Sequence, residues 1–306
     1  MEFIRNLLAD PVGQAVIAPF VIGFALALIL RIGGGAVWGR RLAVLAIGAG
    51  FFAACYFIVG FPPLPPVSFG QKMVVIAAAG LALGFVLDVA GLARAGGHLF
   101  ACVLPAAALF WLWQRDITAG PGTALIVTLL ALFLVSVVVY WRQAASARGS
   151  DTEEASSAAL FPPIQVLVAA IGFAGIGVVD VPASSALLSA ALAAAAGGYL
   201  LLSFLVHLVS ARALGYGAIG AFGGGGVWLA LGYAAVFRAE TQTKLVLLGV
   251  VALAFVADLF ARPLALSIGS GGAARFVQPL VYGLVVAVPP GAALAYTWFV
   301  LGWRMN

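Results

Sequence analysis

Residues 123–141, TALIVTLLALFLVSVVVYW, form an apolar run that contains no charged side chain. Roughly 20 residues of α-helix cross the hydrocarbon core of a bilayer, which is about 30 Å thick. Similar runs recur along the whole chain of 306 residues, which is 64% hydrophobic and 8% charged. A typical soluble domain is about 25% charged, so the composition predicts an all-α, polytopic integral membrane protein. It excludes a cytosolic enzyme, a nucleic-acid-binding protein and a receptor with a separate soluble domain.

About ten transmembrane helices are predicted, because charged or turn-forming residues divide the apolar sequence into ten runs. The runs lie at about 12–30, 42–60, 73–91, 98–113, 123–141, 164–181, 185–209, 213–237, 245–261 and 276–303. The fourth run is short and the tenth is long, so nine or eleven crossings remain alternatives. An even number of crossings places both termini on the same side of the membrane.

A polar stretch at 142–162 divides the chain into two membrane halves, 1–141 and 163–306, with five predicted helices each. The stretch is rich in serine and alanine and carries mixed charge, which is typical of a linker. Its acidic cluster at 151–154 could coordinate a cation in principle, but such a cluster is more often a solvated loop. We therefore expect no metal and no cofactor.

The distribution of lysine and arginine predicts the orientation, because these residues are concentrated in cytoplasmic loops. With ten helices, one side holds nine of them, including Arg142 and Arg262, and the other side holds six. This favours a cytoplasmic location for the first set and a periplasmic location for both termini. The Ala/Gly-rich helices and the lack of a sorting signal indicate a bacterial inner membrane. Residues 1–14 lead into a membrane helix rather than a cleaved signal, since no small-residue cleavage site follows.

An internal repeat is suggested by the similarity of VLPAAALFWLW at 103–113 to VPPGAALAYTW at 288–298, where six of eleven positions agree. Two shorter matches, of 46–49 with 218–221 and of 82–88 with 252–258, occur in the same order along the chain. Together the three matches pair the second to fourth helices with the eighth to tenth. An offset of six helices makes the two units parallel, unlike the inverted repeat of five plus five helices. Chains rich in Ala, Leu and Gly also produce such matches by chance, so both interpretations stay open.

Three aspartates, Asp88, Asp180 and Asp258, lie near the C-terminal ends of apolar runs. A carboxylate there needs a cationic partner, because burial is costly and the helix dipole is negative at this end. Arg262 lies four residues after Asp258, on the same helical face, and is its predicted partner. Arg94 lies six residues after Asp88 and can pair with it only if the helix unwinds between them.

The predicted topology brings eight candidate residues to one side of the membrane, where they could form a polar vestibule that takes up a proton or an ion. They are Asp88, Arg94, His98, His207, Arg212, Asp258, Arg262 and Arg275. The alternative, which is commoner for such residues, is a set of interfacial ion pairs and long side chains that reach the headgroups. Haem ligation by the two histidines is a much weaker alternative, since lone histidines at helix ends are usually structural.

Glycine and proline predict interruptions in three of the helices, because glycine disfavours a helix through its backbone entropy and proline lacks an N–H. The candidate positions are Pro105, Gly223, Gly224, Gly225, Gly226, Pro289 and Pro290. Interrupted helices at matching places in two halves are typical of a transporter's substrate site. The alternative is that small residues let helices approach closely, as in Gly80-x-x-x-Gly84.

The leading functional hypothesis is passage or handling of a small neutral or lipid-like molecule between the second, fourth, eighth and tenth helices. No charged residue is predicted at the centre of a run, so Tyr233, Tyr282, Tyr296 or Gln278 would supply polar groups there. The alternative is a non-catalytic subunit or assembly factor of a larger membrane complex, with lipids and other subunits as partners. An enzyme is disfavoured, because the runs contain neither paired acids for a metal nor a serine beside a base.

Overall fold

The computed structural model describes residues 10–35, 37–60, 62–146, 157–180, 183–210, 212–237, 242–269 and 271–301. Every regular element in these ranges is a helix. The first half contains η1 (Gly13–Ile17), α2 (Ala18–Gly33), α3 (Trp38–Leu42), α4 (Leu45–Ile58), α5 (Phe69–Val89), α6 (Ala93–Thr118) and α7 (Thr123–Ser146). The second half contains α9 (Phe161–Asp180), α10 (Ala183–Ser210), α11 (Gly217–Phe237), α12 (Gln242–Val256), α13 (Asp258–Leu266), α14 (Ala274–Tyr296) and η2 (Thr297–Leu301).

Within the described ranges, nine helices are long and apolar enough to cross a membrane. The chain is therefore a polytopic membrane protein. Each of the ten predicted runs contains a helix. The sixth run contains α9, whose apolar part, Phe161–Gly177, is shorter than the nine candidate spans. The expected linker at 142–162 is partly helical, because α7 continues to Ser146. The rest of this linker, at 147–156, lies outside the described residues.

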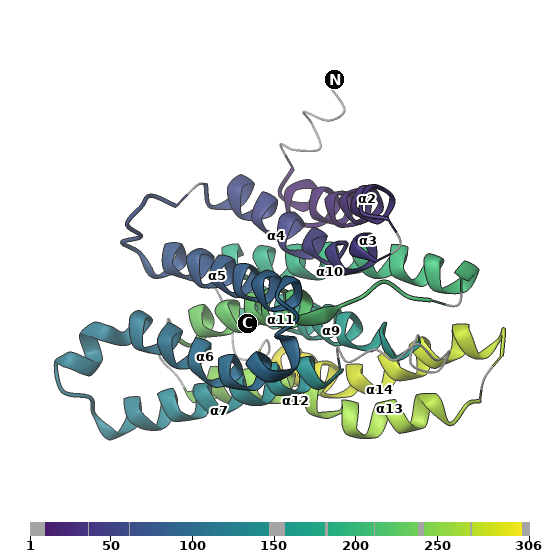
Figure 1. Cartoon of the computed structure of the whole chain (residues 1–306). Coiled ribbons are helices and arrows are strands. Elements are labelled where there is room, and N and C mark those ends of the chain that lie inside the picture. The colour runs from purple at the N-terminus through teal and green to yellow at the C-terminus, as the bar shows by residue number, and fades with distance from the viewer. Residues whose placement is uncertain are drawn as a thin grey trace.

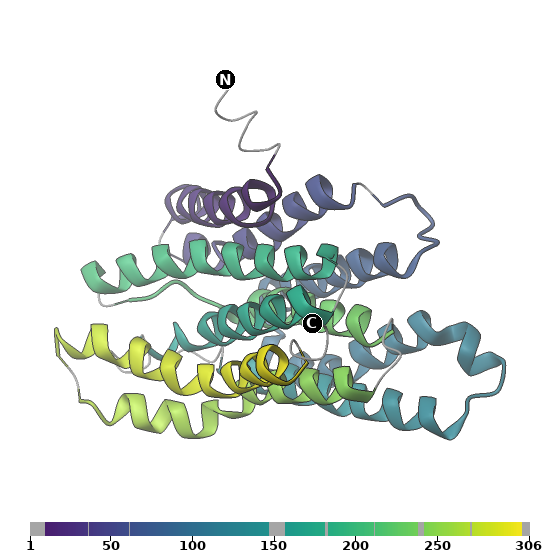
Figure 2. The same cartoon turned by 180° about the vertical axis from the view of Figure 1, so that it is seen from behind.

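Helix α11 lies in the middle of the bundle, between α5 and α10 on one side and α7 and α12 on the other (Figures 1 and 2). Every residue from Ala218 to Val236 is buried. Such a helix is hydrophobic on all faces and has no amphipathic stripe. The other helices pack around it and expose apolar side chains on their outer faces, as lipid contact requires.

Close approach of α5 to α11 depends on two glycines of α5. A Cβ atom at Gly80 would lie 2.5 Å from the carbonyl oxygen of Phe222, and one at Gly84 would lie 2.5 Å from that of Ala218. Small residues at such positions let two helix backbones come into contact. The structure thus confirms the small-residue interpretation of Gly80-x-x-x-Gly84.

The glycine run Gly223–Gly226 lies inside the continuous helix α11, so the break expected there is absent. The glycines instead leave space for side chains. A Cβ atom at Gly224 would lie 2.9 Å from the Tyr216 hydroxyl, and one at Gly226 would lie 2.9 Å from the Tyr140 hydroxyl. Tight packing on all sides offsets the low helix propensity of glycine here.

The prolines do not interrupt their helices either. Helix α6 continues through Pro105 and has non-helical dihedral angles only at Trp113, and α14 continues through Pro289 and Pro290. Transmembrane helices tolerate proline because neighbouring groups satisfy the freed carbonyls. The ninth run is divided instead, by a single-residue interruption at Ala257 between α12 and α13, whose dihedral angles stay in the helical region (φ −57°, ψ −20°), so that Leu245–Leu266 remains one candidate span.

Candidate functional site

Asp258 is the first residue of α13 and directly follows the interruption at Ala257. It lies within the candidate membrane span Leu245–Leu266, and only 3% of its surface is exposed. A buried carboxylate in a membrane span is rare unless it has charged or hydrogen-bonding partners. The residues around Asp258 are therefore the strongest candidate for a functional site.

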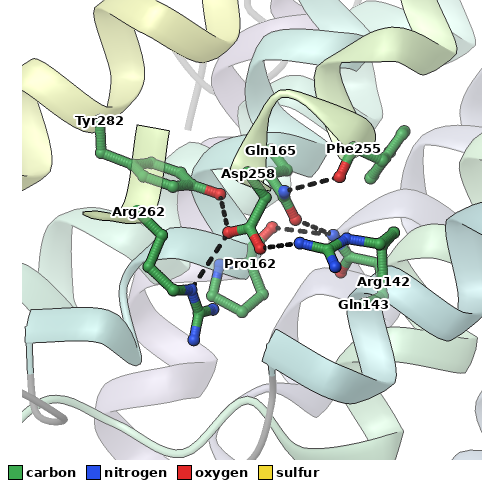
Figure 3. A network of polar contacts seen from close by, with 8 residues as sticks. All are labelled: Arg142, Gln143, Pro162, Gln165, Phe255, Asp258, Arg262 and Tyr282. Carbon is green, nitrogen blue, oxygen red and sulfur yellow. Dashed lines mark hydrogen bonds and ion pairs between the residues drawn. The ribbon is translucent and has the colours of Figure 1, made fainter. Parts of the chain in front are cut away.

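Asp258 has partners on three helices (Figure 3). The Arg262 Nε atom donates to its Oδ1 atom at 3.3 Å, which confirms the predicted pair. The Tyr282 hydroxyl on α14 donates to the same oxygen at 2.8 Å, and Arg142 on α7 forms an ion pair with Oδ2. We refer to Asp258, Arg142, Arg262 and Tyr282 as the Asp258 cluster.

An aromatic ring of α9, that of Phe161, packs against two members of the cluster, Tyr282 and Arg262. The rings of Phe161 and Tyr282 are stacked, with their centroids 3.9 Å apart and an interplanar angle of 5°. The guanidinium group of Arg262 lies 5.7 Å from the centre of the Phe161 ring, within the range of a cation–π interaction. These contacts restrict both the tyrosine hydroxyl and the guanidinium group to one position beside Asp258.

Two glutamines extend the polar network beside the cluster (Figure 3). The Gln143 Nε2 atom donates to Gln165 Oε1 at 2.6 Å and lies 3.5 Å from the carbonyl oxygen of Pro162. The Gln165 Nε2 atom lies 3.5 Å from the carbonyl oxygen of Phe255, two residues before the interruption at Ala257. The network therefore joins α7 and α9 to the end of α12.

The cluster is rich in hydrogen-bond donors. It contains two guanidinium groups and one carboxylate, which gives these groups a formal charge of +1. Within the described part of the chain, the buried atoms Arg142 Nε, Arg262 Nη2 and Gln143 Oε1 have no hydrogen-bond partner. Buried polar atoms are nearly always paired in folded proteins. The two arginines, whose side chains are 24% and 27% exposed, supply the donors suited to an acceptor-rich, anionic group.

Asp88 has a different environment, at the end of α5. Its Oδ1 and Oδ2 atoms accept hydrogen bonds from the backbone N–H groups of Ala218 at 2.9 Å and Ile219 at 2.8 Å. It therefore caps the N-terminus of α11, where the helix dipole is positive. The side chain of Arg94, its predicted partner, lies outside the described residues.

The capping role follows from the spacing of Asp88 along α5. Gly80, Gly84 and Asp88 are four residues apart and lie on one face of the helix. The two glycines bring the helices close enough for the carboxylate to reach the α11 backbone. The repeated spacing was a signal in the sequence for this contact, and the prediction of a partner for Asp88 did not use it. The pairing of Asp88 with Arg94, expected only if the helix unwinds between them, stays a prediction.

The remaining described candidates of the predicted vestibule lie on α6, on α10, in the segment that follows α10, and on α14. His207 is buried on α10, with its Nε2 atom 3.2 Å from the Ser157 hydroxyl, whereas His98 is exposed and edge-on to Trp141. Arg212 is exposed and Arg275 is partly buried, and the side chain of Asp180 lies outside the described residues. Of the eight candidates, the structure brings Asp258 and Arg262 together.

Sequence reasoning missed Arg142, Gln143 and Gln165. Arg142 and Gln143 were assigned to the linker, and Arg142 is 116 residues away from Asp258 in the chain. Tyr282 was among the polar residues proposed for the membrane interior, and it does reach the cluster. The aromatic residue Trp141 just before Arg142 was the available sign that α7 continues to the membrane interface.

A small pocket lies at the N-terminal ends of α5 and α10, with a volume of about 160 Å³. The hydroxyl-bearing residues Ser68, Ser184 and Ser185 line part of it. Sites for small organic ligands usually measure about 300–1,000 Å³, so this pocket is too small for most of them. Among the described residues, no group of three or more His, Cys, Asp or Glu side chains is placed to hold a metal ion.

Comparison of the chain with known protein families and with curated proteins finds no match.

Proposed function

We propose that the protein moves or handles a lipid-like molecule in the membrane, with the Asp258 cluster as its site. The observation that carries this proposal is the buried ionic cluster at the interruption between α12 and α13. Ionisable residues inside membrane spans usually mark a substrate or ion pathway. The proposed site lies among α7, α9, α13 and α14, and of the four helices expected from the sequence it includes the tenth, which is α14.

The depth of the two arginines supports an amphiphilic ligand. Arg142 lies three residues before the end of the span Thr123–Ala145. Arg262 lies four residues before the end of the span Leu245–Leu266, which is about 6 Å along a helix axis. Their side chains are 24% and 27% exposed. The pocket at the N-terminal end of α5, about 160 Å³ in volume, is too small for most soluble ligands, which favours a lipid-like ligand at the cluster.

We propose that the protein resides in a bacterial inner membrane with both termini in the periplasm. The support for this orientation is the excess of lysine and arginine on the side that includes Arg142 and Arg262. In this orientation the Asp258 cluster lies near the cytoplasmic leaflet.

Flux in proteoliposomes tests the proposed function. The purified protein is reconstituted with fluorescently labelled phosphatidylglycerol or phosphatidylcholine, and movement of the label between leaflets is followed by quenching with dithionite. We expect exchange well above that of protein-free vesicles, and a reduced rate for Arg262→Gln. The control is Arg115→Gln, which changes an exposed arginine of α6. A rate equal to that of empty vesicles with both labels would refute transport of these lipids.

A second candidate is a non-catalytic subunit of a larger membrane complex. The observation that favours it is the filled core, because α11 is buried from Ala218 to Val236 and the pocket measures only about 160 Å³. A subunit needs no substrate path, whereas a transporter needs one in at least one of its conformations. The state of assembly in the native membrane separates the two functions.

A further inference from the structure

We infer that Arg142 and Arg262 bind the anionic headgroup of a membrane lipid, through a phosphate or carboxylate group. This inference rests on the proposed function for the lipid-like nature of the ligand, and it adds the chemical class of the headgroup. Guanidinium groups match phosphate and carboxylate oxygens with paired hydrogen bonds. Two of them on one carboxylate leave a positive charge that Asp258 does not neutralise.

The unpaired donors of the cluster are the second observation that points to an anion. Arg142 and Arg262 each have one buried nitrogen without an acceptor in the described part of the chain. These two atoms are enclosed, and a headgroup oxygen reaches the guanidinium groups through the exposed parts of the side chains, which are 24% and 27% exposed. Gln143, the residue after Arg142, is fully buried and its Oε1 atom also has no partner among the described residues, so it does not contact the headgroup directly.

The surface next to the cluster fits the acyl chain of such a lipid. Leu259 and Phe260 on α13 are exposed apolar side chains, and Leu259 lies three residues before Arg262, on the same helical face. Trp141 on α7 is also exposed and directly precedes Arg142. A headgroup bound between the two arginines therefore has apolar surface beside it for its tail.

The arginines are held in position before any ligand arrives. Asp258 binds both of them, and the stacked pair of Phe161 and Tyr282 supports Arg262 from the side. A preorganised site loses less conformational entropy on binding. Specific binding, rather than the loose electrostatic attraction of any basic surface, is the expected result.

Native mass spectrometry of the purified full chain tests the site. The protein is mixed with phosphatidylglycerol or with phosphatidylcholine of the same acyl chains. Both lipids carry a phosphate, but the choline cation of phosphatidylcholine neutralises its headgroup and is repelled by the two arginines, so a preference for phosphatidylglycerol of about tenfold is the expected result. Arg262→Gln should abolish this preference, whereas Arg115→Gln, the control at an exposed arginine, should keep it. Equal binding of the two lipids by the unaltered protein would overturn the inference, and so would an undiminished preference in Arg262→Gln.

A second measurement needs no variant and so does not depend on whether Arg262→Gln folds. Phenylglyoxal modifies accessible arginines, and the modified positions are found by peptide mass analysis. We expect phosphatidylglycerol to protect Arg142 and Arg262 but not Arg115, and phosphatidylcholine to protect none of them. Inorganic phosphate tests whether the ligand is a free phosphate ion instead of the phosphate of a lipid headgroup. Protection by phosphate equal to that by phosphatidylglycerol would overturn the assignment to a lipid headgroup.

The outcomes separate this inference from the proposed function. If phosphatidylglycerol binds at the two arginines but no flux is found, the headgroup site stands and lipid transport fails. If flux is found without any preference for the anionic lipid, transport stands and the headgroup site fails.

Discussion

Asp258 accepts bonds from two arginines and a tyrosine, so it is the residue on which the cluster depends most. Asp258→Asn removes the negative charge and leaves two arginines facing each other. Breaking a buried ion pair by removing one partner costs about 3–5 kcal/mol. Because both arginines are partly exposed, we expect a loss of stability at the lower end of this range. Thermal unfolding in detergent measures it, with the exposed Asp116→Asn on α6 as the control.

Exchange of the two charges distinguishes this cluster from an isolated pair. In an isolated pair, Asp258→Arg combined with Arg262→Asp should restore the stability that either single substitution removes. In the cluster, Arg142 would then face a second cation and Tyr282 would lose its acceptor. We therefore expect the double variant to stay as unstable as Asp258→Asn. Full recovery would show that Arg142 and Tyr282 contribute nothing.

At the scale of elements, the close contact between α5 and α11 predicts that adding a methyl group at Gly84 destabilises the protein. An alanine Cβ atom there would lie 2.5 Å from the carbonyl oxygen of Ala218, a backbone atom that cannot rotate away. Overpacking of this kind typically costs about 1–3 kcal/mol, so Gly84→Ala should lower the unfolding temperature. Gly249→Ala on α12 is the matched control, because no atom lies within 4 Å of the added methyl group. Equal unfolding temperatures for the two variants would contradict the close approach.

The positions of the helices could be predicted from the sequence, because length and hydrophobicity are local properties of the chain. The interruptions could not. The run Gly223–Gly226 has a low intrinsic helix propensity, but the side chains of Tyr216 and Tyr140 fill the space beside it. The actual interruption, at Ala257, is a single residue with helical dihedral angles, and the proline of this run, Pro263, lies six residues after it. Its position is recognisable only from the polar groups that surround it in space.

In the candidate site, too, the local contact could be predicted from the sequence and the contact between distant helices could not. Asp258 and Arg262 are four residues apart on one helix, so their pairing follows from helix geometry alone. Arg142 reaches them only through the packing of α7 against α12, which no local pattern reveals. The parallel relation of the second to fourth with the eighth to tenth helices stays a prediction, as does the orientation in the membrane.

At the scale of the whole molecule, the choice between transporter and subunit depends on what surrounds the chain in its membrane. Helix α11, buried from Ala218 to Val236, and the helices packed around it form a core that needs no other chain to cover it. We therefore expect the protein, gently extracted at natural abundance, to migrate on a native gel alone or as a small homo-oligomer. Obligate subunits usually bury more than about 2,000 Å² against their partners, and such contacts survive mild detergents. Co-migration with other chains in fixed proportion would favour the subunit function, and the outer apolar faces would then be the contact surfaces. Migration without them would leave the Asp258 cluster as the feature that the function has to explain.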